Sequence, residues 1–452
     1  MVEYEARDRQ QTTDVRYLYV LPVLFYEYLA LSLTRSLIPR MMVSFFGSWT
    51  YQIIGISEAV KGILAFVSCS VFGKLSDKVG RRKCLFLTVL GTCFPVCLLA
   101  FTGNLWFFVA AQAFSGCFAS TFPLTFAYIS DFVPKEERAP AYGLALATFG
   151  LSFSIGPVTG GYLAKIVGAH VVFTSSLILT ICDLVFIVLY LPESNRMIKH
   201  PSEPRALYNI GIKKEHLPTD FNPLETLKVF KGDRFLSRVA VVTFLYYIGV
   251  WALVSTLMIY VTRQFQFSAV MIGYLLSAFG ICTMLAEGLL VRYTVPVLGE
   301  RLTLQIGLLG FAAQCVIIGL ATSVWMIYSC MIFSFLSNLV YPSISSLVSR
   351  SVGMNAQGEA LGAINGVKAL TEGFGPLVFG YMLSMFETTF LPGTPYLVAA
   401  VFALSALIVS FSFPEEGGMD GLTDLEDISD PLEGKGLLDD DDDDEIHNET
   451  VL

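Results

Sequence analysis

Charged side chains that interrupt long apolar runs are the residues of this sequence best suited to chemistry. Glu27 lies in the first apolar run, about 15 Å along a helix that starts near Tyr17. A charge inside a bilayer is costly unless it faces a cavity or a partner. We therefore expect Glu27 to bind protons or a cationic group. A structural ion pair with Arg35 or Lys61 is the alternative.

Two further pairs of opposite charges fall at helical spacing. Glu58 and Lys61 are three residues apart, and Lys368 and Glu372 are four apart. Each pair therefore shares one face of a helix. Internal neutralisation and a functional role explain both pairs equally well. Lys368 and Glu372 lie deeper in their apolar run, and we predict that they contribute to substrate or proton binding.

Uncharged polar and aromatic side chains at mid-depth complete the predicted cavity. The amides are Gln112, Gln314, Asn338 and Asn365, and the aromatic walls are Tyr246, Tyr247, Trp251 and Tyr341. Amides and aromatic rings suit a sugar or a planar organic solute, although simple packing also explains each aromatic residue. Asp183 is expected to be structural, and Glu287 to serve a gate. All four histidines lie outside the apolar middle, which disfavours a histidine proton relay.

No catalytic constellation accompanies these residues. The sequence contains no nucleophile–base pattern, metal-ligand cluster or phosphate-binding loop, so we predict no enzyme, no cofactor and no metal site. Nothing in it indicates nucleic acid binding. The nine cysteines lie in or beside apolar runs without a Cys-x-x-Cys pair, which is typical of small helix residues rather than of disulfides.

Membrane spans are the elements that must position the candidate residues. The chain has 452 residues, of which 54% are hydrophobic and only 15% are charged, a composition typical of membrane proteins. Twelve apolar runs have about the length that crosses a bilayer as a helix. They lie near residues 17–38, 52–75, 84–103, 106–130, 140–165, 170–192, 239–262, 268–291, 302–322, 325–349, 359–385 and 395–413.

A polar central segment divides the runs six and six. The predicted parts are an N-terminal segment (1–16), a first bundle (17–192), a linker with a surface amphipathic helix (193–238), a second bundle (239–414) and a disordered acidic tail (415–452). A shift of 219 residues superposes the bundles without a gap and matches, for example, Gly80 with Gly299, Trp106 with Trp325 and Pro123 with Pro342. Parallel repeats of this kind are typical of transporters with a midplane site.

The distribution of basic residues predicts the orientation in the membrane. One set of loops carries the basic cluster at 74–83 and most other loop lysines and arginines, while the opposite loops carry few. By the positive-inside rule both termini face the cytosol.

The stretch GKLSDKVGRR, residues 73–82, matches at every defining position the G-x-x-x-D-x-x-G-R-R/K loop of the major facilitator superfamily, and the chain resembles that family. The resemblance implies an all-α polytopic membrane protein with twelve transmembrane helices in two pseudo-symmetric six-helix bundles. It also implies a gate formed by this loop and the acidic loop of residues 131–138, with Asp77 directed at the eleventh helix near Gly358 and the acidic loop paired with Arg81 or Arg82. The gating residues are Gly73, Asp77, Gly80, Arg81, Arg82, Asp131 and Arg138.

A second stretch, from Gly143 to Gly161, is similar to the fifth-helix motif of the family's drug:proton antiporters, with Ser152 replacing a glycine. Small residues let helices approach closely, and we expect the interface between bundles to use Gly156, Pro157, Gly160, Gly161, Gly375 and Pro376. Gln112 stands where proton-linked members often have Arg. The overall pattern resembles the hippocampus-abundant-transcript-like branch, which is similar to bacterial tetracycline-resistance proteins.

The tail suggests partners outside the membrane. Leu437 and Leu438 end an acidic dileucine pattern used in endosomal sorting, and Thr450, Val451 and Leu452 resemble a C-terminal ligand for PDZ grooves. We predict a secondary active transporter of a small sugar-like or drug-like organic solute by alternating access, in the plasma membrane or an endosomal or lysosomal membrane. Proton coupling and uniport both fit the sequence. The alternative is a non-transporting scaffold or sorting protein that works through its tail.

Overall fold

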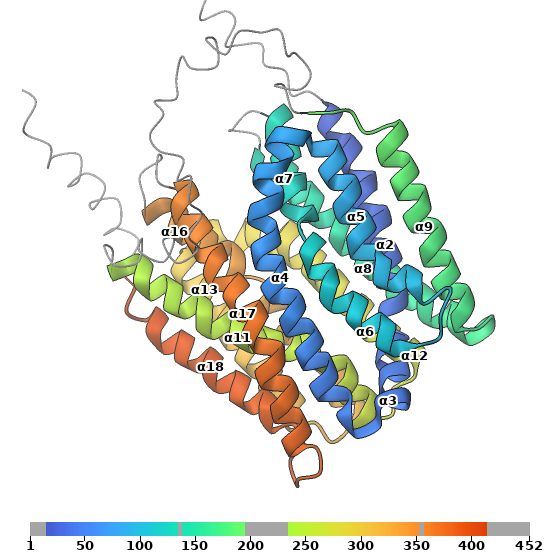
Figure 1. Ribbon diagram of the computed structural model, residues 1–452. Coiled ribbons are helices and arrows are strands. Elements are labelled where there is room, and N and C mark those ends of the chain that lie inside the picture. The colour runs from blue at the N-terminus through green and yellow to red at the C-terminus, as the bar shows by residue number, and fades with distance from the viewer. Residues whose placement is uncertain (1–14, 134–137, 195–233, 352–356, 414–452) are drawn as a thin grey trace, which may run out of the picture.

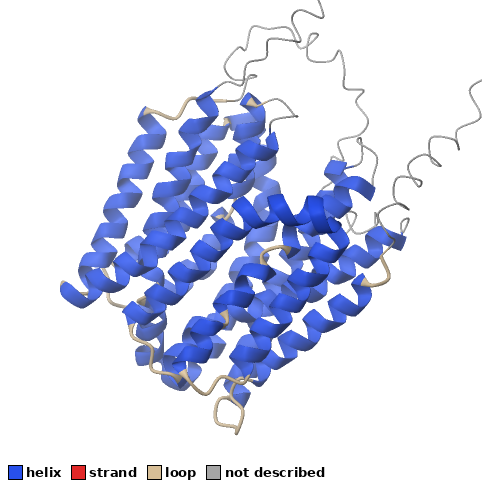
Figure 2. Ribbon diagram, turned by 180° about the vertical axis from the view of Figure 1, so that it is seen from behind, coloured by secondary structure: helices blue, strands red, loops and turns tan. Residues whose placement is uncertain are grey.

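The computed structural model describes residues 15–133, 138–194, 234–351 and 357–413, which form helices and connecting loops without strands (Figures 1 and 2). Most of the central segment and the whole tail lie outside these residues. The predicted amphipathic helix, the dileucine pattern and the C-terminal PDZ ligand therefore lie outside them too, and these remain predictions.

The first half of the chain contains six spans in order. The helices are η1 (Val15–Tyr19), α2 (Val20–Arg35), α3 (Ile38–Phe46), η2 (Gly47–Trp49), α4 (Thr50–Val79), α5 (Arg81–Leu98), α6 (Leu105–Phe114), η3 (Ser115–Phe118), α7 (Thr121–Phe132), α8 (Arg138–Ile166) and α9 (Ala169–Leu189). The first span is longer than predicted, because α3 continues it beyond a break that precedes Pro39.

The second half repeats this order. Its helices are α11 (Arg234–Gln264), α12 (Ala269–Leu285), the π-helical turn η6 (Ala286–Leu290), α13 (Val291–Gly319), α14 (Val324–Ser329), α15 (Met331–Ser337), α16 (Val340–Ser351), α17 (Gln357–Phe386) and α18 (Thr394–Ser410). In Figure 1, α11, α17 and α18 lie on the opposite side of the molecule from α5 and α9.

The helices account for the twelve predicted spans. Among the described residues, eight helical stretches are long and apolar enough to cross a membrane. The other four spans are the shorter apolar helices α12 and α18, and the helices α5 and α17, whose sequences include charged residues. Large apolar side chains such as Ile178 and Val188 are half exposed on the outside of α9, as expected for a surface that faces lipid.

The repeat is visible in the backbone at Gly80 and Gly299. Gly80 separates α4 from α5 at φ 113° and ψ 148°, and Gly299 breaks α13 at φ 78° and ψ 162°. Side chains with a Cβ are strained in this region. The two halves therefore turn from one span into the next at equivalent glycines.

Spans 4 and 10 are broken at equivalent depths. Span 4 leaves helical geometry at Ala119–Ser120 and span 10 at Asn338–Leu339. Pro123 and Pro342 follow these breaks at the third position of α7 and α16. Proline has no N–H to donate to the carbonyl four residues earlier, and its ring clashes with that carbonyl. The prolines thus explain the break that precedes the last helix of each span.

Each half has its own apolar core, and glycines bring the halves together. Buried residues of the first half form two clusters, and those of the second half form one that also includes Tyr51. Between the halves, a Cβ at Gly55 of α4 would lie 2.8 Å from the carbonyl oxygen of Pro376, and a Cβ at Gly273 of α12 would lie 2.5 Å from that of Pro157. Helices α4 with α17, and α8 with α12, therefore pack backbone to backbone.

Candidate functional site

A cavity of about 590 Å³ lies between the two halves. Helices α2–α8 contribute most of its wall, and α11, α12 and α17 of the second half complete it. Its aromatic residues are Tyr28, Phe108, Phe122, Phe149, Phe153, Trp251 and Phe279, and its polar residues are Thr34, Arg35, Ser57, Glu58, Lys61, Thr92, Gln112, Ser115, Thr121, Ser255 and Glu372. An apolar wall with a few polar groups is typical of a small-molecule site.

Glu27 lies behind the wall of this cavity and is 1% exposed. Its Oε1 accepts hydrogen bonds from Thr92 Oγ1 at 2.6 Å and Thr121 Oγ1 at 3.0 Å, and its Oε2 has no hydrogen-bond partner among the described residues. Both threonines line the cavity. In the described part of the chain, neither Arg35 nor Lys61 has a nitrogen within 4.0 Å of a Glu27 carboxylate oxygen, so neither forms the expected ion pair. Two hydroxyl groups thus connect the carboxyl group to the cavity.

The two predicted charge pairs differ in the structure. Lys61 Nζ lies 3.8 Å from Glu58 Oε2, and Gln112 Nε2 donates to Glu58 Oε1 at 3.3 Å. Lys368 and Glu372 do not form an ion pair within 4.0 Å. Lys61, Glu58 and Gln112 lie together in the cavity wall, and Glu372 reaches it from α17.

Lys368 lies outside the cavity wall, between two aromatic rings. Its Nζ is 5.0 Å from the centre of the Tyr247 ring and 4.8 Å from that of Tyr341. Contacts of this kind between a cation and ring faces are stabilising. Asn365, three residues earlier, accepts a hydrogen bond from the Tyr341 hydroxyl at 3.3 Å.

The amides Asn338 and Gln314 lie away from the cavity wall. Asn338 Nδ2 donates to the carbonyl of Ser334 at 3.0 Å, and its Oδ1 accepts from Thr283 at 3.5 Å. Gln314 is 1% exposed. Both amides are thus held within the second half.

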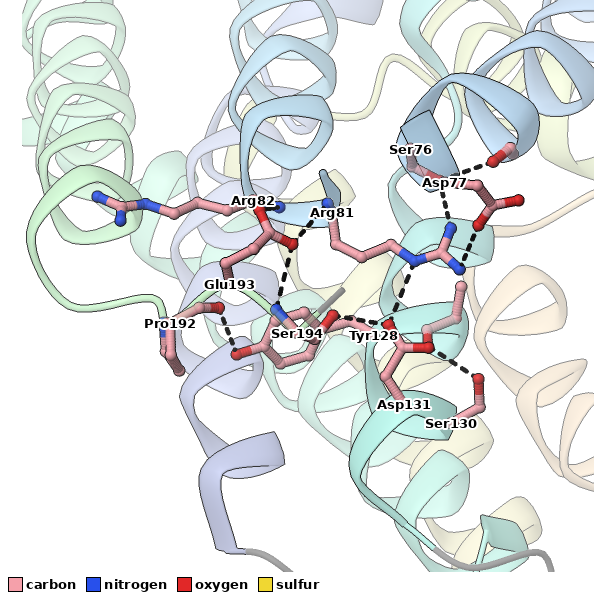
Figure 3. Close-up of polar contacts among 12 residues, drawn as sticks. Ser76, Asp77, Arg81, Arg82, Tyr128, Ser130, Asp131, Pro192, Glu193 and Ser194 are labelled. Carbon is pink, nitrogen blue, oxygen red and sulfur yellow. Dashed lines mark hydrogen bonds and ion pairs between the residues drawn. The ribbon is translucent and has the colours of Figure 1, made fainter. Parts of the chain in front are cut away.

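The loop between α4 and α5 forms a network of charges (Figure 3). Arg81 Nη2 lies 2.7 Å from Asp77 and its Nε lies 3.3 Å from Asp131, so the expected contact between the acidic loop and Arg81 is present. Arg81 Nη1 also donates to Ser76 Oγ, and Arg82 Nε donates to the carbonyl of Ile187 at 2.9 Å. These bonds connect the ends of α4, α5, α7 and α9.

Glu193 completes this network and was not among the predicted residues. Its carboxylate accepts from the backbone N–H groups of Arg81 at 2.9 Å and Arg82 at 3.3 Å (Figure 3). It therefore caps the N-terminus of α5, where unpaired N–H groups and the helix dipole favour an anion. The expected contact of Asp77 with α17 near Gly358, and the side chain of Arg138, involve positions whose side chains lie outside the described residues.

A second polar cluster closes the opposite end of the molecule. Arg263, in the last turn of α11, forms an ion pair with Glu387, donates to the carbonyl of Gly47 and lies 5.3 Å from the centre of the Tyr51 ring. We call these four residues the Arg263 latch. Nearby, Gln52 Nε2 donates to Ser384 Oγ at 2.6 Å. Burial raises the pKa of Glu387, and the charge of Arg263 opposes this shift.

Contacts between the halves concentrate at this end, here called the Gly47 end. Among the described residues, the side-chain hydrogen bonds that join the halves are Arg263–Gly47, Gln52–Ser384 and Tyr162–Tyr274. Toward the other end, here called the Gly80 end, no hydrogen bond or ion pair between described side chains joins the halves, and α4 and α17 diverge (Figure 1). The two halves are thus closed together at the Gly47 end and separated at the Gly80 end.

The six glycines and prolines predicted at the interface divide between two environments. Pro157, Gly161 and Pro376 contact the opposite half. In contrast, a Cβ at Gly156 or Gly160 would collide with Ser32 or Leu33 of the same half, and one at Gly375 would collide with Trp251. The last three glycines bring α8 onto α2 and α17 onto α11 within single halves.

The fold and its central cavity define a polytopic helical membrane protein of the transporter type. The sequence model of the Major Facilitator Superfamily matches residues 20–376 and 239–435, and the chain belongs to this family, whose members are transporters.

Similar proteins include the Homo sapiens "Hippocampus abundant transcript 1 protein", 28% identical over 418 residues that cover 87% of this chain and 83% of the relative. The "Tetracycline resistance protein, class C" of Escherichia coli is 28% identical and covers 78% of this chain and 85% of that protein. The fold is similar to that of the human organic anion transporter MFSD10 (TETRAN), with a TM-score of 0.64, 22% identity and coverage of 87% of this chain and 98% of that one. It is also similar to the nucleoside transporter NupG, with a TM-score of 0.62, 12% identity and coverage of 88% and 99%.

Proposed function

We propose that this protein is a secondary active transporter that moves a small organic solute by alternating access. The observation that carries the proposal is the cavity of about 590 Å³ between halves that touch at the Gly47 end and separate at the Gly80 end. Its volume falls in the range of small-molecule sites, about 300–1,000 Å³. Parallel repeats with a site between them support transport by rocking of one half against the other.

The contacts suggest what changes during the cycle. Opening the Gly47 end requires the Arg263 latch and the glycine contacts of α4 with α17 to separate. Closing the Gly80 end brings Asp77 toward the N-terminus of α17, where a helix end favours an anion. By the positive-inside rule the Gly80 end and both termini face the cytosol, in the plasma membrane or an endosomal or lysosomal membrane.

Proton coupling operates through Glu27 in this proposal. A charged carboxylate at this depth, with two hydroxyl donors and no described cation within 4.0 Å, is costly. A proton removes that charge, and Thr92 and Thr121 connect the carboxyl group with the cavity. Solute and proton could then influence each other through the same two hydroxyl groups.

The aromatic wall around a few charges suits a planar organic solute. The names of similar proteins indicate the range, because they refer to tetracycline resistance, organic anions and nucleosides. Gln112, Glu372 and the Glu58–Lys61 pair provide the polar contacts of the cavity.

Transport by purified protein in vesicles tests the proposal. A panel of labelled organic anions, organic cations, nucleosides and sugars is offered with and without a pH gradient. We expect at least one solute to accumulate with the gradient, and Glu27→Gln to reduce this accumulation at least tenfold. Ser405→Ala, a partly exposed position on α18 whose hydroxyl donates to the carbonyl of Val401 in the same helix, is the control. Gradient-driven accumulation that survives Glu27→Gln would refute the proton role. If no solute class in the panel is transported, and removal of residues 415–452 abolishes the function of the protein in cells, a scaffold would be favoured.

A further inference from the structure

Lys368 is an amine without a carboxylate partner. In the part of the chain that the structure describes, no acidic oxygen lies within 4.0 Å of its Nζ. Its neighbours are instead the faces of Tyr247 and Tyr341. A lysine inside a membrane protein normally pairs with an acid, so this arrangement leaves a positive charge available to a ligand.

The position of Lys368 places it on the route to the cavity. Glu372 and Trp251 line the cavity, and Lys368 and Tyr247 lie one helical turn before them, about 6 Å toward the Gly80 end. Because the halves separate at that end, a solute that enters there passes Lys368 before it reaches the cavity wall.

A second hydrogen-bond donor lies on the same face of α17. Asn365 precedes Lys368 by three residues, and spacing of this kind places side chains next to each other. The Tyr341 hydroxyl donates to Asn365 Oδ1, and this bond orients the amide so that its Nδ2 remains available as a donor. Tyr341 also lies in the first turn of α16, where the helix dipole adds positive potential.

We propose that Lys368 and Asn365 form an anion subsite that holds the carboxylate of an aromatic organic acid, with the Tyr247 and Tyr341 rings beside it. This inference rests on the proposed function and assigns the class of its solute. Glu372 and Glu287, the acids that face this region, lie too far from Lys368 to neutralise it by direct contact. A bound carboxylate would do so through charge-assisted hydrogen bonds. A cationic solute would be repelled by Lys368, and a neutral one would leave its charge unpaired.

Benzoate, benzamide and benzylammonium all carry one phenyl ring but are anionic, neutral and cationic, so together they distinguish the three kinds of solute. Thermal stabilisation of the purified full-length protein reports binding without any need for transport. We expect benzoate to stabilise the protein most, and Lys368→Gln to weaken benzoate binding about tenfold or more. Lys368→Arg should retain part of the effect, because guanidinium also pairs with carboxylate. Lys165→Gln, an exposed lysine in the last turn of α8, is the control.

Three outcomes would overturn the anion subsite: equal stabilisation of wild type and Lys368→Gln by benzoate, a stronger effect of benzamide or benzylammonium, or no effect of benzoate on the wild type. Failure of the proposed function looks different. In that case vesicles show no transport, although benzoate still binds through Lys368. If vesicles transport solutes without preference for anions, the transport proposal stands and the subsite is wrong.

Discussion

Removal of the Arg263 side chain should open the Gly47 end. The latch joins the halves through two contacts, the bond from Arg263 to the Gly47 carbonyl and the approach of its guanidinium to the Tyr51 ring. The ion pair with Glu387 lies within the second half and holds the guanidinium in place. Arg263→Ala removes both contacts between the halves.

The structure allows an estimate of the effect. A hydrogen bond from a charged donor contributes about 1.5–3 kcal/mol, and a cation–π contact about 0.5–2 kcal/mol. Since the Arg263 side chain is 18% exposed, water replaces part of this energy, and we take about 2 kcal/mol. That corresponds to roughly a 30-fold change in the equilibrium between closed and open. A protein closed about 99% of the time would then be closed about 77% of the time.

Cysteine labelling from the Gly47 side measures this change. Met42→Cys places a thiol in the cavity wall on α3, where the native side chain is 2% exposed, in a background without the nine native cysteines. Its reaction with a membrane-impermeant maleimide should accelerate about 10- to 30-fold in Arg263→Ala. Arg40→Ala, an exposed arginine near the same end, should leave the rate unchanged. An unchanged rate in Arg263→Ala would refute the latch.

Four further outcomes follow from the structure. Because burial raises the pKa of Glu387, its protonated form favours the folded protein. This stabilisation is complete below the ordinary glutamate pKa of about 4.3 and is lost as the pH rises through the raised pKa. Glu387→Gln should remove this pH dependence of the melting temperature. Gly299→Ala should destabilise by about 1–3 kcal/mol because of its backbone conformation, whereas Gly366→Ala, in open helix, should not lower the melting temperature. Glu193→Gln should cost about 1 kcal/mol through the weakened cap of α5, measured by the same melts, and an unchanged melt would contradict the cap. Asp77→Asn should reduce vesicle transport while surface expression stays near normal; normal transport would contradict the gate.

The spans and their repetition could be predicted because the signals are local. Apolar length alone locates the helices, and a fixed shift of 219 residues relates the halves. The matched glycines Gly80 and Gly299 both adopt positive φ, and the matched prolines Pro123 and Pro342 both follow a helix break. In each case one residue type has a backbone effect that does not depend on distant neighbours.

The partners of the candidate residues could not be predicted in the same way. Thr92 and Thr121 reach Glu27 from 65 and 94 residues away, and threonines are common in apolar runs. Arg263 and Glu387 are likewise brought together only by the packing of α11 against the loop after α17. Which polar groups meet depends on how helices rotate about their axes, and apolar composition does not determine that rotation.

Both halves contain a broken span, and an ionisable group lies beside each break: an acid in the first half and an amine in the second. Thr121, a ligand of Glu27, opens α7, and Tyr341, beside Lys368, lies in the first turn of α16. Glu27 in one half and Lys368 in the other therefore each contact a residue at the start of a half-helix. Any swivel of a half-helix about its proline-induced break changes the surroundings of its ionisable group directly. If Glu27 takes up a proton and Lys368 binds an anion, as proposed, a movement shared by the two halves would alter both affinities in a single step.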